Sequence, residues 1–387
     1  MRISTGMLYQ AGVSTIQEQT AKLLQTQQQV ATGRRVTSPS DDPIASVRAL
    51  EVTQARNINA AWQTNQGYAT DALGLLENKL AAVEEIYIHT RTRAVEAGNG
   101  SYSNSELAAI AVDVRANFDA LLALANSQNG QGEYLFSGYQ ADTQPFTGNI
   151  NGVSFQGDQG QRTLQVSSSQ ILSVSNSGAE VFNSVRAPQG SFFAVPGSPN
   201  GGTGHIAQAQ TTGAYANTRY NIAWDGTNYN VTNADTGAAV VSQAGPTLTF
   251  GAVQLEMGGT PSVGDVFEVG PRANVFNMFT NMVRALENPS ATVGIGGAVS
   301  QAMTGLDQAL DQELSVRASV GSRMLEVNAL ESVGSDLDVQ YAQTLSRLQD
   351  VDYAEAVSNL TLQQTYLQAA QQSFMRISNL SLFNYLS

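Results

Sequence analysis

The sequence predicts an α+β multidomain protein, in which a long α-helical coiled-coil rod formed by both termini carries an inserted all-β domain. Three observations predict this fold. Eight of the ten prolines lie within 145–289, and none lies within 44–144 or 290–387. Apolar residues recur at heptad spacing near both ends of the chain. Strand-like alternation is confined to the middle, where 20 of the 35 glycines fall within 137–270.

The N-terminal segment has the spacing of a coiled-coil helix. Apolar residues recur every seven positions, and a second, partly polar series lies between them: Tyr9, Ile16, Leu23 and Val30, with Val13, Thr20 and Gln27. Gly33 is expected to end this helix as its C′ residue. In the turn that follows, Asp41 precedes Asp42, the expected N-cap of a second helix. Pro43 would be that helix's first residue, where its missing N–H costs nothing.

The second helix is expected to run to about Ala97. Its apolar stripe comprises Ile58, Trp62, Ala69, Ala72, Leu76, Leu80, Val83 and Tyr87. Asn104 or Ser105 is expected to cap a third helix that reaches about Asn126. A short strand is expected at 133–136, before the middle region begins.

The middle region alternates like strands separated by turns. Apolar residues alternate with polar ones on both sides of the turn Asp225-Gly226, which predicts a β-hairpin. They are Tyr220, Ile222 and Trp224 before the turn and Tyr229 and Val231 after it. Further strands are expected at 247–250 and 266–269.

Helix is expected again from Pro271 to about Glu287 and from about residue 296. Near the C-terminus the heptad spacing returns, with Tyr353, Leu360, Leu367 and Phe374, and with Ala356, Gln363, Ala370 and Ile377 three residues on. We therefore expect three parts: terminal assembly arms at 1–42 and 341–387, a helical rod at 43–136 and 271–340, and a β domain at 137–270.

The two terminal series are too polar to be self-sufficient, because glutamine and threonine occupy several core positions. Two such helices bury too little apolar surface to offset the conformational entropy that they lose when they become ordered. One interpretation is an antiparallel pair private to one molecule. The favoured interpretation is that neighbouring subunits cover the outer faces of both arms, so the residues Tyr9 to Val30 and Tyr353 to Ile377 would form inter-helix and inter-subunit contacts.

Composition excludes several classes of partner. The net charge is −13, the isoelectric point is near 4.5, and only two lysines occur, Lys22 and Lys79. No segment could neutralise a run of phosphates, so we expect no nucleic acid and no anionic membrane surface as partner. The first residues have no apolar signal-peptide core, which predicts either a cytoplasmic protein or export without a cleaved signal.

No residue constellation predicts catalysis. The chain has no cysteine and two histidines, His89 on a helix and His205 in a Gly/Ser/Thr-rich loop, neither near a nucleophile or a ligand-spaced acid. The tripeptide Asp235-Thr236-Gly237 occurs once and is interpreted as a turn. We therefore expect a protein that is not an enzyme and that binds no cofactor and no metal.

Two motifs resemble the bacterial flagellin superfamily. They are the segment 31–43, with Ala-Thr-Gly-Arg-Arg-Val-Thr-Ser-Pro-Ser-Asp-Asp-Pro, and the segment 132–138, with Gly-Glu-Tyr-Leu-Phe-Ser-Gly. Pro43 and the ending from Asn379 to Leu386 are similar to the hook-associated members, whereas flagellins usually carry alanine at the position of Pro43. The resemblance covers roughly the first 140 and the last 115 residues.

This resemblance implies a structural adaptor of the bacterial flagellum, which joins a first hook-associated junction protein to the flagellin filament and packs against copies of itself in a ring. It also implies a cytosolic export chaperone for the C-terminal helix and an extracellular location in the flagellum. The alternatives are a flagellin-like filament subunit and, from a different class, a binding module whose β region holds a ligand.

Overall fold

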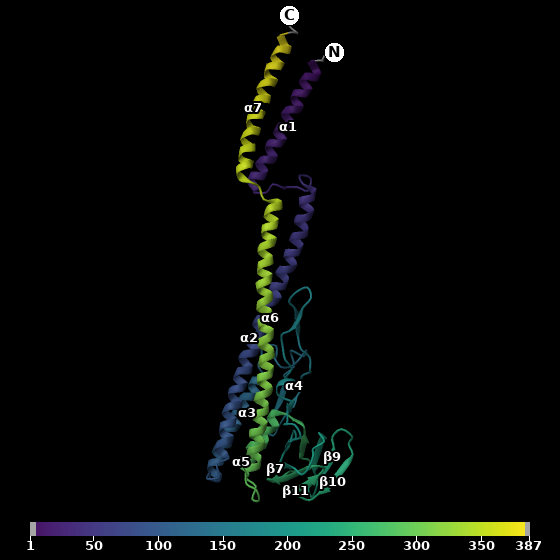
Figure 1. Ribbon diagram of the computed structural model, residues 1–387, viewed down its shortest axis with the longest axis vertical. Helices are drawn as coiled ribbons and strands as arrows, with labels where there is room; N and C mark the ends of the chain where they lie inside the picture. The colour runs from purple at the N-terminus through teal and green to yellow at the C-terminus, as the bar shows by residue number, and fades with distance from the viewer. Residues whose placement is uncertain (1–4, 384–387) are drawn as a thin grey trace. The chain divides into compact units, whose positions relative to one another are not determined.

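The computed structural model describes residues 5–383, and the side chains in that range except those of residues 5, 6, 8 and 377–383. The helices are α1 (Thr5–Thr32), α2 (Pro43–Ala97), α3 (Asn104–Ala125), α4 (Gly178–Val181), α5 (Val275–Glu287), α6 (Gly296–Gln349) and α7 (Tyr353–Phe383) (Figure 1). The strands are β1 (Phe146–Asn149), β2 (Gly152–Phe155), β3 (Thr163–Gln165), β4 (Ile171–Ser173), β5 (Val185–Arg186), β6 (Phe193–Pro196), β7 (His205–Thr211), β8 (Tyr220–Trp224), β9 (Tyr229–Asn233), β10 (Ala239–Gln243), β11 (Thr247–Phe250), β12 (Val253–Gly258), β13 (Val266–Gly270) and β14 (Arg272–Ala273).

The chain forms two compact units. The first, the arm unit, contains residues 1–64 and 331–387, and the second, the central unit, contains residues 65–330. Helical ends and an inserted β region confirm the predicted fold class. The predicted three-part division at 42, 136, 270 and 340 stays a prediction.

The helical core of the central unit follows a strict heptad rhythm along α2. Buried residues recur at alternating steps of three and four: Ala69, Leu73, Leu76, Leu80, Val83, Tyr87, Thr90, Ala94 and Ala97. This stripe belongs to one apolar core with buried residues of α3, α5 and α6. Aromatic rings pack together in this core. Among them, the ring of Phe118 lies edge-on to that of Phe276, with centroids 5.7 Å apart.

Strands β6 to β13 form two antiparallel sheets, and the other described strands pair in three two-stranded sheets, β1-β2, β3-β4 and β14-β5. The larger has the strand order β10-β9-β8-β13-β6, and the smaller has the order β11-β12-β7. The predicted hairpin is confirmed, because Trp224 lies opposite Tyr229 and Ile222 opposite Val231. Ile222, Phe267 and Val269 lie in a second apolar core with residues of the smaller sheet.

Polar side chains of helix α5 form hydrogen bonds with the backbone of the β domain. Asn281 accepts from the Ile206 amide at 2.7 Å and donates to the Ile206 carbonyl at 3.1 Å. The buried Arg284 guanidinium donates to the carbonyls of Gly204 and Asn200, both at 3.1 Å. These bonds satisfy backbone groups at and just before the start of β7, so they position this strand against α5.

Three expectations from the sequence need correction. Residues 133–136 form no strand, since Tyr134 makes only an isolated bridge with Gln128. Helix α3 is capped by Ser103, not by Asn104 or Ser105, because Ser103 and Glu106 form a reciprocal capping box. His205 lies in β7 and is fully buried. In addition, residues 350–352 separate α6 from α7, although this segment contains no glycine or proline.

A carboxyl group is buried among charges in the central unit. Glu313 on α6 is 1% exposed, and neither of its oxygens has a hydrogen-bond partner within the described residues. Arg317 lies 3.6 Å from it but is engaged by Glu77, at 2.6 Å, and by Glu84. Burial raises the pKa of Glu313 to about 8, Arg317 opposes that rise, and Glu84 and Glu77 add to it.

We expect this carboxyl group to make the stability of the central unit fall with rising pH. Its pKa is higher in the folded than in the unfolded chain, so its contribution is full at low pH and is lost as pH rises through about 8. Glu313→Gln should remove this dependence and raise the free energy of unfolding at pH 8.5 by about 2–4 kcal/mol.

Urea unfolding from pH 5 to 9 measures this, with the exposed Asp311→Asn on the same helix as the control. An unchanged pH profile in Glu313→Gln would contradict the assignment.

Candidate assembly interface

The two ends of the chain form an antiparallel helical pair in the arm unit. Tyr9 near the start of α1 contacts Phe374 near the end of α7, with ring centroids 5.0 Å apart. At the other end of the pair, Gly33 lies beside the Tyr353 hydroxyl. Figure 1 shows α1 and α7 running side by side in this orientation. The intramolecular pair that the sequence left as one interpretation is therefore present.

Each helix buries one narrow strip against the other. On α7 the covered positions are the predicted ones: Ala356, Leu360, Gln363, Leu367, Ala370 and Phe374. On α1 the half-buried positions include Val13, Ile16, Thr20, Leu23 and Val30. One predicted position is wrong, because Gln27 is exposed and Thr26 is buried, its hydroxyl donating to the Lys22 carbonyl at 3.0 Å. Tyr9 and Tyr353 stay 57% and 56% exposed.

Gly12 sets the spacing of the pair near Phe374. A Cβ atom built on Gly12 would lie 2.6 Å from Cδ2 of Phe374, closer than carbon atoms can approach. The absent side chain therefore makes room for the aromatic ring. Gly12 is not among the residues predicted from the heptad spacing, although a glycine inside a helix next to a heptad position signals close packing.

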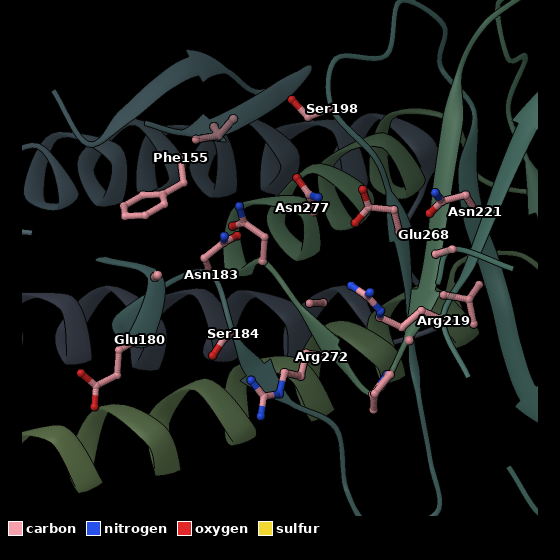
Figure 2. A pocket seen from close by; sticks show the side chains of 18 of the residues that line it. Phe155, Glu180, Asn183, Ser184, Ser198, Arg219, Asn221, Glu268, Arg272 and Asn277 are labelled. Atoms are coloured by element: carbon pink, nitrogen blue, oxygen red, sulfur yellow. The ribbon is translucent and has the colours of Figure 1, made fainter. Parts of the chain in front are cut away.

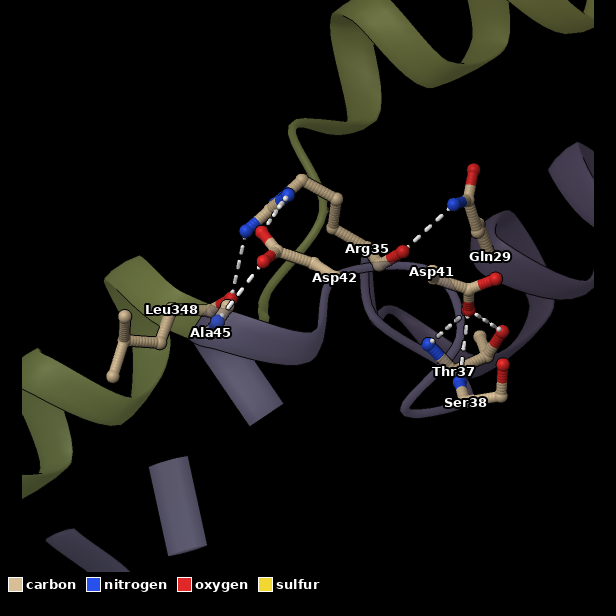
Figure 3. Close-up of polar contacts among 8 residues, drawn as sticks. All are labelled: Gln29, Arg35, Thr37, Ser38, Asp41, Asp42, Ala45 and Leu348. Atoms are coloured by element: carbon tan, nitrogen blue, oxygen red, sulfur yellow. Dashed lines mark hydrogen bonds and ion pairs between the residues drawn. The ribbon is translucent and has the colours of Figure 1, made fainter. Parts of the chain in front are cut away.

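The turn between α1 and α2 is organised by Asp41. Its Oδ2 atom accepts from the Thr37 amide at 3.0 Å, the Thr37 hydroxyl at 2.8 Å and the Ser38 amide at 2.8 Å (Figure 3). Its Oδ1 atom accepts from Gln25 of α1 at 3.0 Å. Hydrogen bonds from Ser38 and Thr37 lower the pKa of Asp41, so the carboxylate stays charged.

Asp42 caps α2 as predicted. Its Oδ1 atom accepts from the Ala45 amide at 2.9 Å, and Pro43 is the first helical residue. The other oxygen pairs with Arg35 at 3.2 Å. The same guanidinium donates to the Leu348 carbonyl at 3.0 Å, so Arg35 ties the N-terminal turn to the end of α6 (Figure 3).

Backbone hydrogen bonds join the N-terminal turn to the break between α6 and α7. The Arg35 amide donates to the Gln349 carbonyl at 2.6 Å, and the Val351 amide donates to the Gly33 carbonyl at 2.9 Å. Gly33 has φ of +70°, the left-handed conformation expected of a C′ glycine. Asp352 then caps α7 by accepting from the Ala354 amide at 2.9 Å. This aspartate is the sequence signal that locates the break.

Apolar side chains remain exposed on both flanks of the α7 strip. Val357 and Met375 are 49% and 57% exposed and lie a whole number of helical turns apart, hence on one flank. Leu362 and Tyr366, 47% and 55% exposed, share the other flank. On α1, Leu24 is 59% exposed. The pair thus leaves apolar surface that the partner helix does not cover.

Charge is nearly absent from both helices. In α1 the charged residues are Glu18 and Lys22, which pair with each other at 2.7 Å, and in α7 they are Glu355 and Arg376. Other molecules could therefore cover this surface without desolvating many charges.

Of the predicted seam residues, the structure brings Tyr9 to Val30 against Leu360 to Phe374. Ile377 lies outside the residues whose side chains are described. That any of them contacts a neighbouring subunit stays a prediction. Within residues 5–383, acidic and histidine side chains form no group of three that could hold a metal ion. In the same range, no helix is apolar and long enough to span a membrane.

An antiparallel pair made by both chain ends, with a β domain inserted far from either end in sequence, is the architecture of flagellin-type subunits. The bacterial flagellin N-terminal helical region matches residues 3–141, and the bacterial flagellin C-terminal helical region matches residues 303–386. The D2-like domain of flagellar hook-associated protein 1 matches residues 197–271. The chain belongs to the bacterial flagellin superfamily.

Within this superfamily the chain is similar along its whole length to hook-associated members. It is 29% identical over 388 residues to flagellar hook-associated protein 3 of Salmonella typhimurium, with 99% of both chains covered. FlgL of Xanthomonas campestris aligns with 76% of this chain and 99% of its own, at 27% identity and a TM-score of 0.55. The flagellar junction protein FlgL of Legionella pneumophila aligns with 78% of this chain and 100% of its own, at 26% identity and a TM-score of 0.54.

We expect Gly12→Val to separate α1 from α7 near Phe374. The added side chain would overlap the aromatic ring, and such overpacking costs about 1–3 kcal/mol. Hydrogen exchange should therefore become faster in 5–20 and 365–376. Gly67→Val on α2 is the matched control, because a Cβ there meets nothing within 4 Å. Equal exchange in the two variants would contradict the role of Gly12.

Proposed function

We propose that this protein is a structural adaptor subunit of the bacterial flagellum, placed between a hook-associated junction protein and the flagellin filament. The observation that carries the proposal is the uncovered apolar surface on both flanks of the α1–α7 pair, which is almost free of charge. A helix pair with such a surface is suited to close lateral packing in an assembly. The full-length similarity to hook-associated protein 3 supports the position in the flagellum.

The partners follow from that position. We propose that copies of this chain form a ring through the flanks of the helical pair, with the first junction protein on one side and flagellin on the other. A contact that builds a ring joins two different patches, and two unlike flanks on α7 provide them. Before assembly the exposed helix would aggregate, so a cytosolic chaperone is proposed to cover α7 until export to the extracellular flagellum.

The alternative is a flagellin-like filament subunit, since flagellins share the terminal helical regions. Deletion of the gene separates the two functions. Loss of an adaptor should leave finished hooks without filaments and flagellin monomers in the medium. Loss of a filament subunit would instead remove the bulk filament protein itself, which mass spectrometry of the medium and electron microscopy of the cells would show.

Point variants test the surface that carries the proposal. Leu24→Asp changes an exposed residue, so the monomer should keep its helix content, whereas burying the charge in an assembly should cost about 3 kcal/mol or more per subunit. Leu367→Asp changes the strip between α1 and α7, and should disrupt both the pair and the assembly while the β domain stays folded.

Filament attachment and swimming measure assembly, and circular dichroism with limited proteolysis measures the monomer. Gln372→Asp, at an exposed polar position of α7 on the side away from the strip, is the control. Normal filaments in the Leu24→Asp strain would argue against the flanks as the assembly surface.

A further inference from the structure

A large cavity lies in the central unit, far in sequence from the terminal helices. Its volume is about 1120 Å³, slightly above the usual range of small-molecule sites. It is lined by β8 and β13, by the start of α5 and by the segment 177–184 (Figure 2), and it opens to solvent, since Asn217, Asn221 and Glu268 are exposed. The helical core and the β-domain core border it from two sides, and junctions between cores are common places for ligand sites.

Strand register directs one polar row into the cavity. Glu268 on β13 lies directly opposite Asn221 on β8, so the two side chains share a face of the sheet. The neighbouring Phe267 and Ile222 are fully buried in the β-domain core on the other face. The Glu268 side chain is exposed, and partial desolvation by the surrounding protein raises its pKa, while Arg219 acts in the opposite direction.

A hydrogen-bond acceptor without a donor lies across the cavity. Asn277, near the start of α5, is 5% exposed, and its Oδ1 atom has no hydrogen-bond partner among the described residues. Figure 2 shows Asn277 between Glu268 on one side and Asn183 on the other. A buried carbonyl oxygen without a partner is costly unless water or a ligand donates to it.

Most of the remaining polar lining is neutral. Amide and hydroxyl side chains predominate, among them Gln159, Gln161, Asn183, Ser184, Ser198 and Asn217. The charged residues nearly balance, and Arg219 is already paired with Asp235. Phe155, which is half-buried, adds aromatic surface to the lining.

The polar, nearly neutral lining favours a neutral ligand with many hydroxyl groups. An apolar ligand would leave the amides and the Glu268 carboxyl unpaired, which costs free energy. The carboxylates and arginines of the lining nearly cancel, so it favours neither a strongly cationic nor a strongly anionic ligand. A neutral, hydroxyl-rich ligand can donate to Glu268 and Asn277, bond the amides and lay its rings on aromatic surface.

We propose that this cavity binds a short neutral oligosaccharide, whose hydroxyl groups donate to Glu268 and to Oδ1 of Asn277 and one of whose sugar rings contacts Phe155. The site is independent of the terminal helices. It therefore adds a carbohydrate-binding activity to a chain whose arms serve assembly.

The test is binding of maltotetraose and of tri-N-acetylchitotriose to the purified full-length chain, by saturation-transfer NMR and calorimetric titration. At least one of the two should bind. Glu268→Ala should weaken that binding about tenfold, the loss expected for one hydrogen bond to a charged group. Glu268→Gln should keep most of the affinity, because the amide oxygen still accepts from a hydroxyl. Glu256→Ala on β12, outside the cavity lining, should bind like the wild type.

Three results would overturn the proposal. One is the absence of saturation transfer from both oligosaccharides. Another is equal binding by Glu268→Ala and the wild type, with circular dichroism and thermal melting showing that both are folded. The third is tight binding of spermine that Glu268→Gln and Glu268→Ala abolish alike, because that result would identify a cation site.

Discussion

The pairing of the two chain ends is the contact on which the arm unit depends. It is made by the bonds between Gly33 and Val351 and between Arg35 and Gln349, which join segments more than 300 residues apart. These bonds fix the relative position of α1 and α7, so that Tyr9 meets Phe374 at the other end of the pair. The cost of closing so long a loop grows only slowly with its length, which makes such a junction feasible.

The terminal helices could be predicted from sequence because their signals are local. Asp42, Pro43 and Gly33 mark helix ends by their own backbone chemistry, and the heptad spacing from Leu360 to Phe374 identifies the buried strip. The error at Gln27 has a physical reason. The covered strip advances three residues from Leu23 to Thr26 where the heptad pattern requires four, and the buried Thr26 hydroxyl is satisfied by the Lys22 carbonyl.

The β domain and the cavity were less predictable because they depend on contacts distant in sequence. His205 lies in a glycine-rich context typical of a loop, yet its backbone pairs with Gly258 and its ring is buried. No local sequence pattern predicts that Glu268 shares a face of the sheet with Asn221, or that Asn277 lies across the cavity from both. The hairpin at Asp225-Gly226 was found because both of its strands and its turn are contiguous in the chain.

Because α1 and α7 are joined at Gly33 and Val351, the apolar strip of α1 is covered only in a chain that includes α7. A polypeptide that stops short of α7 has no partner for Ile16 or Leu23, whose apolar surface then stays open along the whole of α1. Such a fragment differs from the intact subunit at the face that would contact neighbours. In the proposed assembly, a copy without α7 would therefore lack the surface that its neighbours contact.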